Sequence, residues 1–161
     1  MTDRASRAAA QWAVARPDLD LLAMETLGRL HEASILVTRE RQAPLYAQYG
    51  LQHGEFDVMA TLRRAPTADG LTATALYEAT MMSSGGMTAR LDRLQKAGLI
   101  ERGPHPTDRR AALVRLTPKG FDLIETLMPL HMQAAQHMLS DLTREEQATL
   151  GALLARLIKG L

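Results

Sequence analysis

The chain has no cysteine among its 161 residues, so it can form neither a disulfide nor a thiol-based redox switch. Cysteine-free sequences are typical of reducing compartments. The sequence also lacks a run of about 18 apolar residues, the length that a membrane-spanning helix needs. Its first residues, MTDRASRAAAQW, include an acid and have no apolar core, unlike a secretory signal. We therefore expect a cytoplasmic protein with no membrane segment.

Signatures of catalysis and of metal binding are missing as well. Ser83 and Ser84 do not stand in a nucleophile elbow, and neither paired carboxylates nor a phosphate-binding loop is evident. The histidines show no spacing typical of metal ligands; they are His31, His53, His105, His131 and His137. We therefore expect no enzyme activity, no cofactor and no metal site. A histidine pair that senses pH or metal across a dimer remains an alternative.

Charge is present, but it is unevenly distributed along the chain. The formal net charge is +1, yet between Gly85 and Gly120 eight bases stand against three acids, which gives +5 and leaves −4 for the rest. A basic segment on a mildly acidic body concentrates the attraction for phosphate groups on one face. The same charges would also suit an ordinary solvated surface loop.

Apolar periodicity and capping residues predict a mainly helical chain with one small β-hairpin. The predicted helices cover 6–15, 19–41 with Asp18 as cap, 55–64, a segment opened by Thr72, a segment from Ser83 or Ser84 to Gly98, 118–139 with Pro129 inside, and a last segment opened by Thr143. A break is expected at 44–50. The two helices on either side of Ser83 have the tight connection of a helix-turn-helix.

The helix that starts at Ser83 or Ser84 has two different faces. Met87, Leu91 and Leu94 recur at helical spacing and are predicted to point inward. The opposite face carries Ala89, Asp92, Arg93 and Lys96, with Thr88 beside them. We expect DNA contacts from Thr88, Ala89, Arg93 and Lys96 on this helix, and from Ser83, Ser84 and Gly86 at its start. Arg90 flanks the apolar stripe and is expected to turn back toward the protein body. Two glycines in one first turn weaken a helix, so we expect them to permit a close approach.

A basic hairpin follows this helix. Residues 99–102 and 112–116 have the composition of short strands, and the loop between them contains Asp108, Arg109 and Arg110. Paired arginines at a hairpin tip suit the minor groove of DNA, whose negative potential attracts guanidinium groups. A solvated hairpin without a partner is the alternative. A helix-turn-helix followed by such a hairpin is a winged helix.

The two chain ends are predicted to be helical, with more apolar surface than a monomer readily covers. A two-fold homodimer would cover that surface and would match a pseudo-palindromic operator in double-stranded DNA.

The segments SSGGMTARLDRLQKAGL and DRRAALVRLTPKG resemble the MarR family of bacterial transcription regulators. The resemblance is most specific over residues 71–120, and the helical order extends it to nearly the whole chain. It implies N-terminal helices at 1–48 for ligand and dimer contacts, a winged helix-turn-helix DNA-binding lobe at 52–118, and C-terminal dimerisation helices at 119–161. It also implies an obligate homodimer that represses transcription until a small molecule binds between the dimer region and the DNA-binding lobe.

A finer resemblance concerns the effector. A urate-responsive branch of the family has an added N-terminal helix with a tryptophan, and it combines this with an aspartate and two arginines near the recognition helix and the wing. The corresponding residues in this chain are Trp12, Asp57, Arg90 and Arg102. An indole can stack on a flat purine, and a guanidinium can bind its anionic edge. The resemblance therefore implies urate or a related purine metabolite as effector.

The sequence leaves alternatives open for the ligand, for the residues that bind it and for the function. The ligand could be another aromatic or carboxylate compound, Trp12 could be a packing residue, Asp57 a surface acid, and the two arginines phosphate contacts. A winged-helix module for protein contacts or nonspecific DNA binding, without effector response, is the alternative function.

Overall fold

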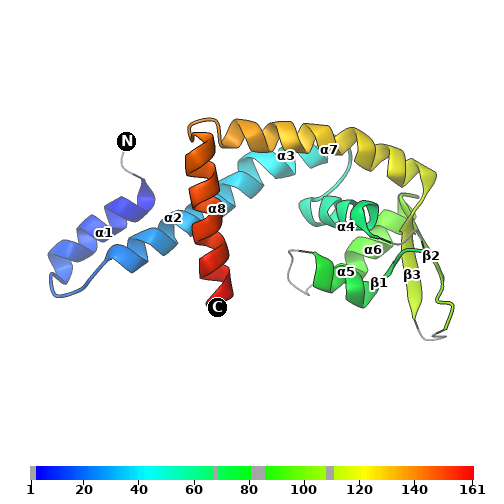
Figure 1. The fold of residues 1–161 in the computed structure, drawn as a ribbon, viewed down its shortest axis with the longest axis horizontal. Coiled ribbons are helices and arrows are strands. Elements are labelled where there is room, and N and C mark those ends of the chain that lie inside the picture. Colours follow the sequence, from blue (N-terminus) through cyan, green and yellow to red (C-terminus); the bar gives the residue numbers. More distant parts are fainter. Residues whose placement is uncertain (1–2, 67–68, 81–85, 108–110) are drawn as a thin grey trace. The chain divides into compact units, whose positions relative to one another are not determined.

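A computed structural model describes residues 3–66, 69–80, 86–107 and 111–161 of the chain. The chain divides into two compact units, residues 1–49 and residues 50–161, which Figure 1 colours from blue to cyan and from cyan-green to red. Within the described ranges, no helix combines the length and the apolar character that crossing a bilayer requires.

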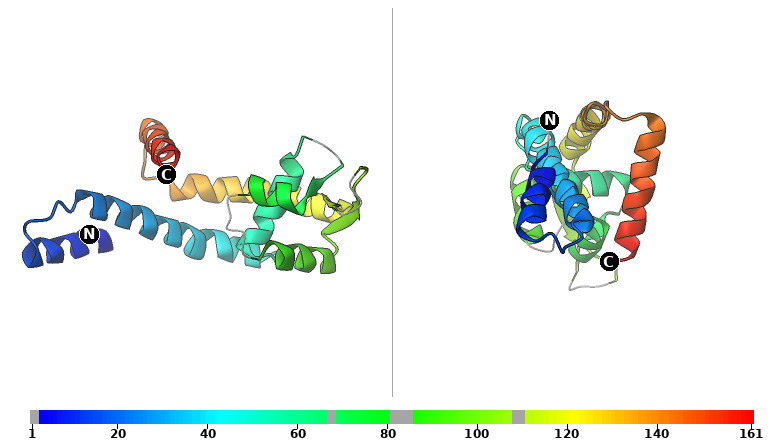
Figure 2. Two further views of the ribbon diagram at one scale, coloured as in Figure 1. Left: turned by 90° about the horizontal axis from the view of Figure 1, so that it is seen from below. Right: turned by 90° about the vertical axis from the view of Figure 1, so that its left-hand side faces the viewer.

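Unit 1 is entirely helical where it is described. Helix α1 spans Arg4–Ala15 and doubles back along α2, which spans Leu22–Leu36 (Figure 2). Asp3 caps α1 by accepting a hydrogen bond from the backbone N–H of Ser6 at 2.7 Å. The two helices meet closely because Gly28 has no side chain: a Cβ there would lie 3.0 Å from that of Ala5.

Two predictions for unit 1 are wrong. Asp18 does not cap α2, because its carboxylate accepts hydrogen bonds from Arg16; the first N–H of α2 instead donates to Asp20 at 3.1 Å. The break expected at 44–50 is also helical at its start. A π-helical stretch η1, Val37–Gln42, leads directly into α3, Ala43–Ala47. Pro44 stands in the first turn of α3.

Unit 2 begins with a winged helix-turn-helix, as predicted. Its elements are α4 (His53–Arg64), β1 (Leu71–Thr72), α5 (Ala73–Ala79), α6 (Met87–Lys96), β2 (Ile100–Pro104) and β3 (Ala112–Leu116). The strands form an antiparallel sheet in the order β1-β3-β2, with Leu71 opposite Val114 and Ile100 opposite Leu116. Two strands of this sheet were predicted; β1 was missed, because two residues are too short to show an alternating pattern.

The core of unit 2 is built from the apolar stripes of its helices and the inner face of its sheet. The fully buried side chains include Met59, Leu76, Leu94, Ile100, Val114, Ile124 and Leu127. Phe56, Met59 and Leu62 of α4 are all buried, as their spacing predicted. Thr72 caps α5 by accepting a hydrogen bond from the N–H of Ala75 at 3.1 Å, which also was predicted.

Two helices complete unit 2. Helix α7 spans Pro118–Met138 with Pro129 inside it, and α8 spans Arg144–Lys159. Both begin at the predicted threonine. Thr117 accepts from the N–H of Gly120 at 3.1 Å, and Thr143 forms a capping box with Glu146. Helix α7 packs against α4 and β3, which joins it to the winged helix-turn-helix.

Gly120 fixes how closely α7 approaches the sheet. It is buried in the first turn of α7, and a Cβ at this position would overlap the backbone carbonyl oxygen of Leu99. That carbonyl also accepts a hydrogen bond from the N–H of Thr117 at 3.1 Å, so it cannot move freely. The wing and α7 therefore meet backbone to backbone.

We predict that Gly120→Ala lowers the free energy of unfolding by about 1–3 kcal/mol, because the added methyl forces backbone atoms apart. The measurement is urea denaturation at a fixed protein concentration. Asp122→Ala, an exposed change in the same turn, is the control and should stay within about 0.5 kcal/mol. Equal stability of the two variants would show that α7 can shift to admit a side chain.

Candidate nucleic-acid interface

Helix α6 presents a solvent-exposed face next to the wing. Its inward stripe is confirmed: Met87, Leu91 and Leu94 are all buried. On the other side, Thr88, Ala89, Arg93 and Lys96 are exposed. Threonine and alanine are short enough to let a helix backbone approach a base pair closely, and lysine supplies a cation for phosphate. This face therefore has the composition of a groove-reading surface.

The start of α6 differs from the prediction. Gly86 is its N-cap, with a positive φ of 95° that suits glycine, and no side chain caps the helix. The predicted cap at Ser83 or Ser84 is thus wrong, because the described helix begins at Met87; both serines lie outside the described residues. The guanidinium of Arg90 folds back along the helix to Gly86, where an added Cβ would lie 3.6 Å from its Nη1.

A partly buried ion pair holds α6 against α4. The carboxylate of Glu55, only 4% exposed, accepts a hydrogen bond from Nε of Arg93 at 2.6 Å. Nη2 of Arg93 also donates to the side-chain oxygen of Gln52 at 3.0 Å. The second oxygen of Glu55 accepts from the backbone N–H of Gln52 at 2.7 Å, which completes the capping box of α4. One carboxylate thus starts α4 and orients α6.

This network changes the interpretation of Arg93. From the sequence it was assigned to DNA contact, and its side chain is indeed 45% exposed. Two of its nitrogen atoms, however, donate to residues of the protein. Glu55 and Gln52 were not predicted as site residues. The Gln-x-x-Glu spacing just before an apolar run was a visible capping signal, but the sequence could not reveal that Glu55 also binds an arginine 38 positions away.

The wing strands carry further ion pairs. Nη2 of Arg102 on β2 donates to Asp92 of α6 at 2.7 Å, which connects the wing to α6. On adjacent strands, Nε of Arg115 donates to Glu101 at 2.7 Å. Within the described part of the chain, Lys96 has no ion pair. Arg109 and Arg110, predicted for the minor groove, lie outside the described residues.

The four predicted ligand residues occupy different surroundings. Trp12 belongs to α1 of unit 1, and 49% of it is exposed. The other three belong to unit 2: Asp57 on α4, Arg90 beside Gly86 on α6, and Arg102 paired with Asp92. Within unit 2, Asp57, Arg90 and Arg102 thus each have different neighbours. Trp12 belongs to the other unit, and each unit is described by itself.

Asp57 lies near two histidines. Burial lowers the pKa of the His131 imidazole below its ordinary value; the carboxylate of Asp57 acts in the opposite direction, and His53 adds to the lowering. The rings of His131 and Phe56 are 4.8 Å apart, centre to centre. Because His131 belongs to α7, this part of α4 faces that helix. Among the described residues, no three side chains of histidine, aspartate or glutamate gather closely enough to hold a metal ion.

We predict that Glu55→Gln destabilises the protein by about 1–3 kcal/mol, because an amide cannot accept from both Arg93 and the Gln52 backbone with two oxygens. Urea denaturation measures the loss. The control is Glu101→Gln, which breaks an exposed pair with Arg115 and should change stability by less than about 1 kcal/mol. If both variants lose the same stability, the Glu55 pair does not hold α6 in place.

Three comparisons with known proteins agree with this geometry. A profile described as the MarR family matches residues 49–111, which contain α4, the helix-turn-helix and β2. The HTH-type transcriptional regulator PecS of Dickeya dadantii is 37% identical over 151 residues, covering 94% of this chain and 90% of PecS. The multiple antibiotic resistance protein MarR of Escherichia coli is 34% identical over 105 residues, covering 65% of this chain and 71% of MarR.

Solved structures share the fold. A mutant MarR from Escherichia coli complexed with operator DNA has a TM-score of 0.73 and 28% identity, covering 91% of this chain and 96% of that one. A putative MarR-like transcription regulator from Bacillus cereus has a TM-score of 0.78 at 22% identity, covering 88% and 99%. PecS and the Bacillus cereus protein are both named as transcription regulators. With a winged helix-turn-helix and these relatives, the chain belongs to the MarR family of DNA-binding transcriptional regulators.

Proposed function

We propose that the protein is a homodimeric repressor that binds a pseudo-palindromic operator and leaves it when a small anionic aromatic molecule, urate or a related purine metabolite, binds. The observation that carries the DNA-binding part is the outward face of α6. Ala89 and Lys96 are exposed opposite the buried stripe that anchors the helix, and Thr88 is exposed beside them.

The reading mode follows from this face and the wing. Helix α6 enters the major groove, where Thr88 and Ala89 contact base edges and Lys96 contacts a phosphate. Gly86, and the two serines before it, let the start of the helix approach the backbone. Arg109 and Arg110, at the turn between β2 and β3, reach the neighbouring minor groove. The ion pair between Arg102 and Asp92 supports this by connecting the wing to α6 at 2.7 Å.

In this proposal Arg93 both positions α6 and contacts a phosphate. Its Nε and Nη2 are engaged by Glu55 and Gln52, while 45% of the side chain stays exposed. A guanidinium has five N–H donors, so the remaining ones can reach a phosphate without breaking the pair. The fixed side chain then contacts DNA without losing much conformational entropy.

Dimerisation is supported by apolar side chains that one chain leaves exposed. They lie on the helices near both chain ends and include Leu22, Leu27, Leu153 and Ile158, which are 54–71% exposed. Leucine and isoleucine at helical spacing seldom stay in water over such an area. A two-fold axis would bury these faces against a second copy and place two α6 helices on successive turns of DNA.

The effector part of the proposal rests on Trp12, Asp57, Arg90 and Arg102, the four residues that the resemblance to the urate-responsive branch implies. The indole of Trp12 is half exposed and can stack on a purine. Arg90 reaches back to Gly86, the N-cap of α6, so a ligand that draws its guanidinium away acts directly on the start of the reading helix. Differential affinity for the two arrangements then weakens DNA binding.

We predict that Lys96→Ala and Arg110→Ala each lower affinity for a duplex from upstream of the protein's own gene and reduce the salt slope by about one unit per protomer. Fluorescence anisotropy at several salt concentrations measures both effects. Arg144→Ala, at the start of α8 and separated from the wing by the whole of α7, is the control and should change neither. Equal affinity for this duplex and a scrambled one would reject a sequence-specific repressor and favour a nonspecific winged-helix module.

We predict that Trp12→Phe and Arg90→Ala each weaken urate binding, Arg90→Ala by roughly tenfold or more, because it removes a charge-assisted hydrogen bond. Calorimetric titration measures the affinity. Arg115→Ala removes a wing arginine that pairs with Glu101 and should leave it unchanged. Absence of heat with urate, together with release of DNA by a different aromatic or carboxylate compound, would show that the effector is misassigned.

A further inference from the structure

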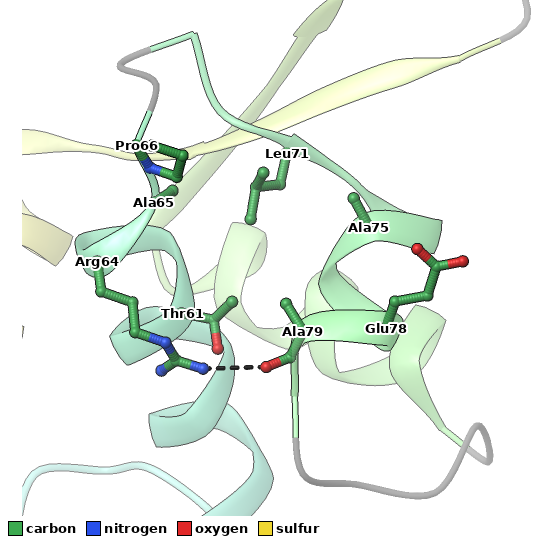
Figure 3. A pocket seen from close by; sticks show the side chains of 8 residues that line it. All are labelled: Thr61, Arg64, Ala65, Pro66, Leu71, Ala75, Glu78 and Ala79. Atoms are coloured by element: carbon green, nitrogen blue, oxygen red, sulfur yellow. Dashed lines mark hydrogen bonds between the residues drawn. The ribbon is translucent and has the colours of Figure 1, made fainter.

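A pocket of about 440 Å³ opens inside unit 2, between α4, α5 and β1 (Figure 3). None of its residues was assigned to DNA or to the effector. Its lining side chains come from three neighbouring elements and the turn after α4: Thr61, Arg64, Ala65, Pro66, Leu71, Ala75, Glu78 and Ala79. A pocket of this size suits a small organic molecule.

Thr61 is an unsatisfied polar group at the back of this pocket. It is only 2% exposed, and its hydroxyl has no hydrogen-bond partner among the residues that the structure describes. A helical threonine commonly donates to a backbone carbonyl one turn earlier. Figure 3 shows the Thr61 hydroxyl turned toward the space between α4 and α5, on the side where Arg64 meets Ala79. A ligand oxygen placed there would accept a hydrogen bond from this hydroxyl.

Arg64 supplies a positive charge at the same end. Its side chain is exposed at the rim, and Nη2 donates to the backbone carbonyl oxygen of Ala79 at 3.0 Å. A guanidinium binds a carboxylate through two parallel N–H groups. The hydroxyl of Thr61 and the guanidinium of Arg64 together therefore favour a carboxylate.

The other side chains that line the pocket determine which chemical groups the rest of the ligand can carry. Leu71, Ala75, Ala79 and Pro66 are aliphatic, and the lining contains no aromatic ring on which a flat molecule could stack. Glu78 stands on the α5 side of the rim, away from Arg64 in Figure 3, and it would repel a second negative charge. We propose that this pocket is a binding site for a small aliphatic monocarboxylate, held by Thr61 and Arg64 and selected against dicarboxylates by Glu78.

A ligand in this pocket would also change the affinity for DNA. The Arg64–Ala79 hydrogen bond fastens the last residue of α5, directly before the connection to α6. A carboxylate that takes the guanidinium competes with the Ala79 carbonyl and loosens that end of α5. This consequence rests on the proposed DNA-binding function, whereas occupancy of the pocket does not.

The direct test is methyl NMR on the full-length protein with cyclohexanecarboxylate as the probe. We expect saturable shifts of the methyl signals of Leu71, Ala75 and Ala79. The neutral cyclohexanecarboxamide should bind at least tenfold more weakly, since it lacks the charge that Arg64 recognises. Cyclohexane-1,3-dicarboxylate should also bind more weakly, and Glu78→Gln should restore part of its affinity. The absence of a saturable shift at these methyl groups would overturn the proposal. Equal affinity for the acid and the amide would overturn it as well.

Matched variants locate the site. Thr61→Val keeps the shape but removes the hydroxyl, so it should weaken the probe at least fivefold while the melting temperature stays equal or rises. Arg64→Gln should weaken it further. Arg63→Gln is the control, because Arg63 lies over the Phe121 ring at 4.8 Å and pairs with Glu125.

Two outcomes contradict the assignment: wild-type affinity in both Thr61→Val and Arg64→Gln, or loss of the shifts in Trp12→Phe, which would move the probe to the proposed effector site. Anisotropy with the upstream duplex is measured separately on the same samples. Failure of specific DNA binding with intact methyl shifts would refute the repressor function and leave this site standing.

Discussion

The structure of the DNA-binding lobe depends on one carboxylate. Glu55 accepts a hydrogen bond from the backbone at the start of α4 and another from Arg93 of α6 at 2.6 Å, while it is almost fully buried. A buried charge is tolerated only where its partners stay in place. The position of the reading helix is therefore fixed relative to α4 by a contact that leaves the outer face of α6 open to solvent.

Two further contacts connect the wing to its neighbours, one to α6 and one to α7. Arg102 connects β2 to α6 through Asp92, and Gly120 lets α7 meet the Leu99 carbonyl without an intervening side chain. A helix that begins against the sheet and runs 21 residues can transmit a displacement at its far end to the wing. In the proposed function, these connections couple a ligand or a dimer contact to the outer face of α6.

Local signals in the sequence predicted much of the fold. The capping threonines Thr72, Thr117 and Thr143 each begin a helix as expected, and the stripe from Met87 to Leu94 is buried. Two errors have different origins: Gly86, with a positive φ that suits glycine, starts α6 in place of a serine, and β1 exists only because it pairs with the distant strand β3. For the site, exposure of α6 was predictable from its periodicity. The Glu55–Arg93 pair and the Thr61 pocket join residues that sequence spacing alone does not relate.

The central claim, that the outer face of α6 contacts DNA, is tested most directly by lysine footprinting. The chain has only three lysines, Lys96 on α6, Lys119 in the first turn of α7 and Lys159 on α8, so acetylation with mass spectrometry follows each of them. With the upstream duplex bound, Lys96 should lose most of its reactivity while Lys159 keeps its own. Unchanged reactivity of Lys96, or protection of Lys159 alone, would contradict the account.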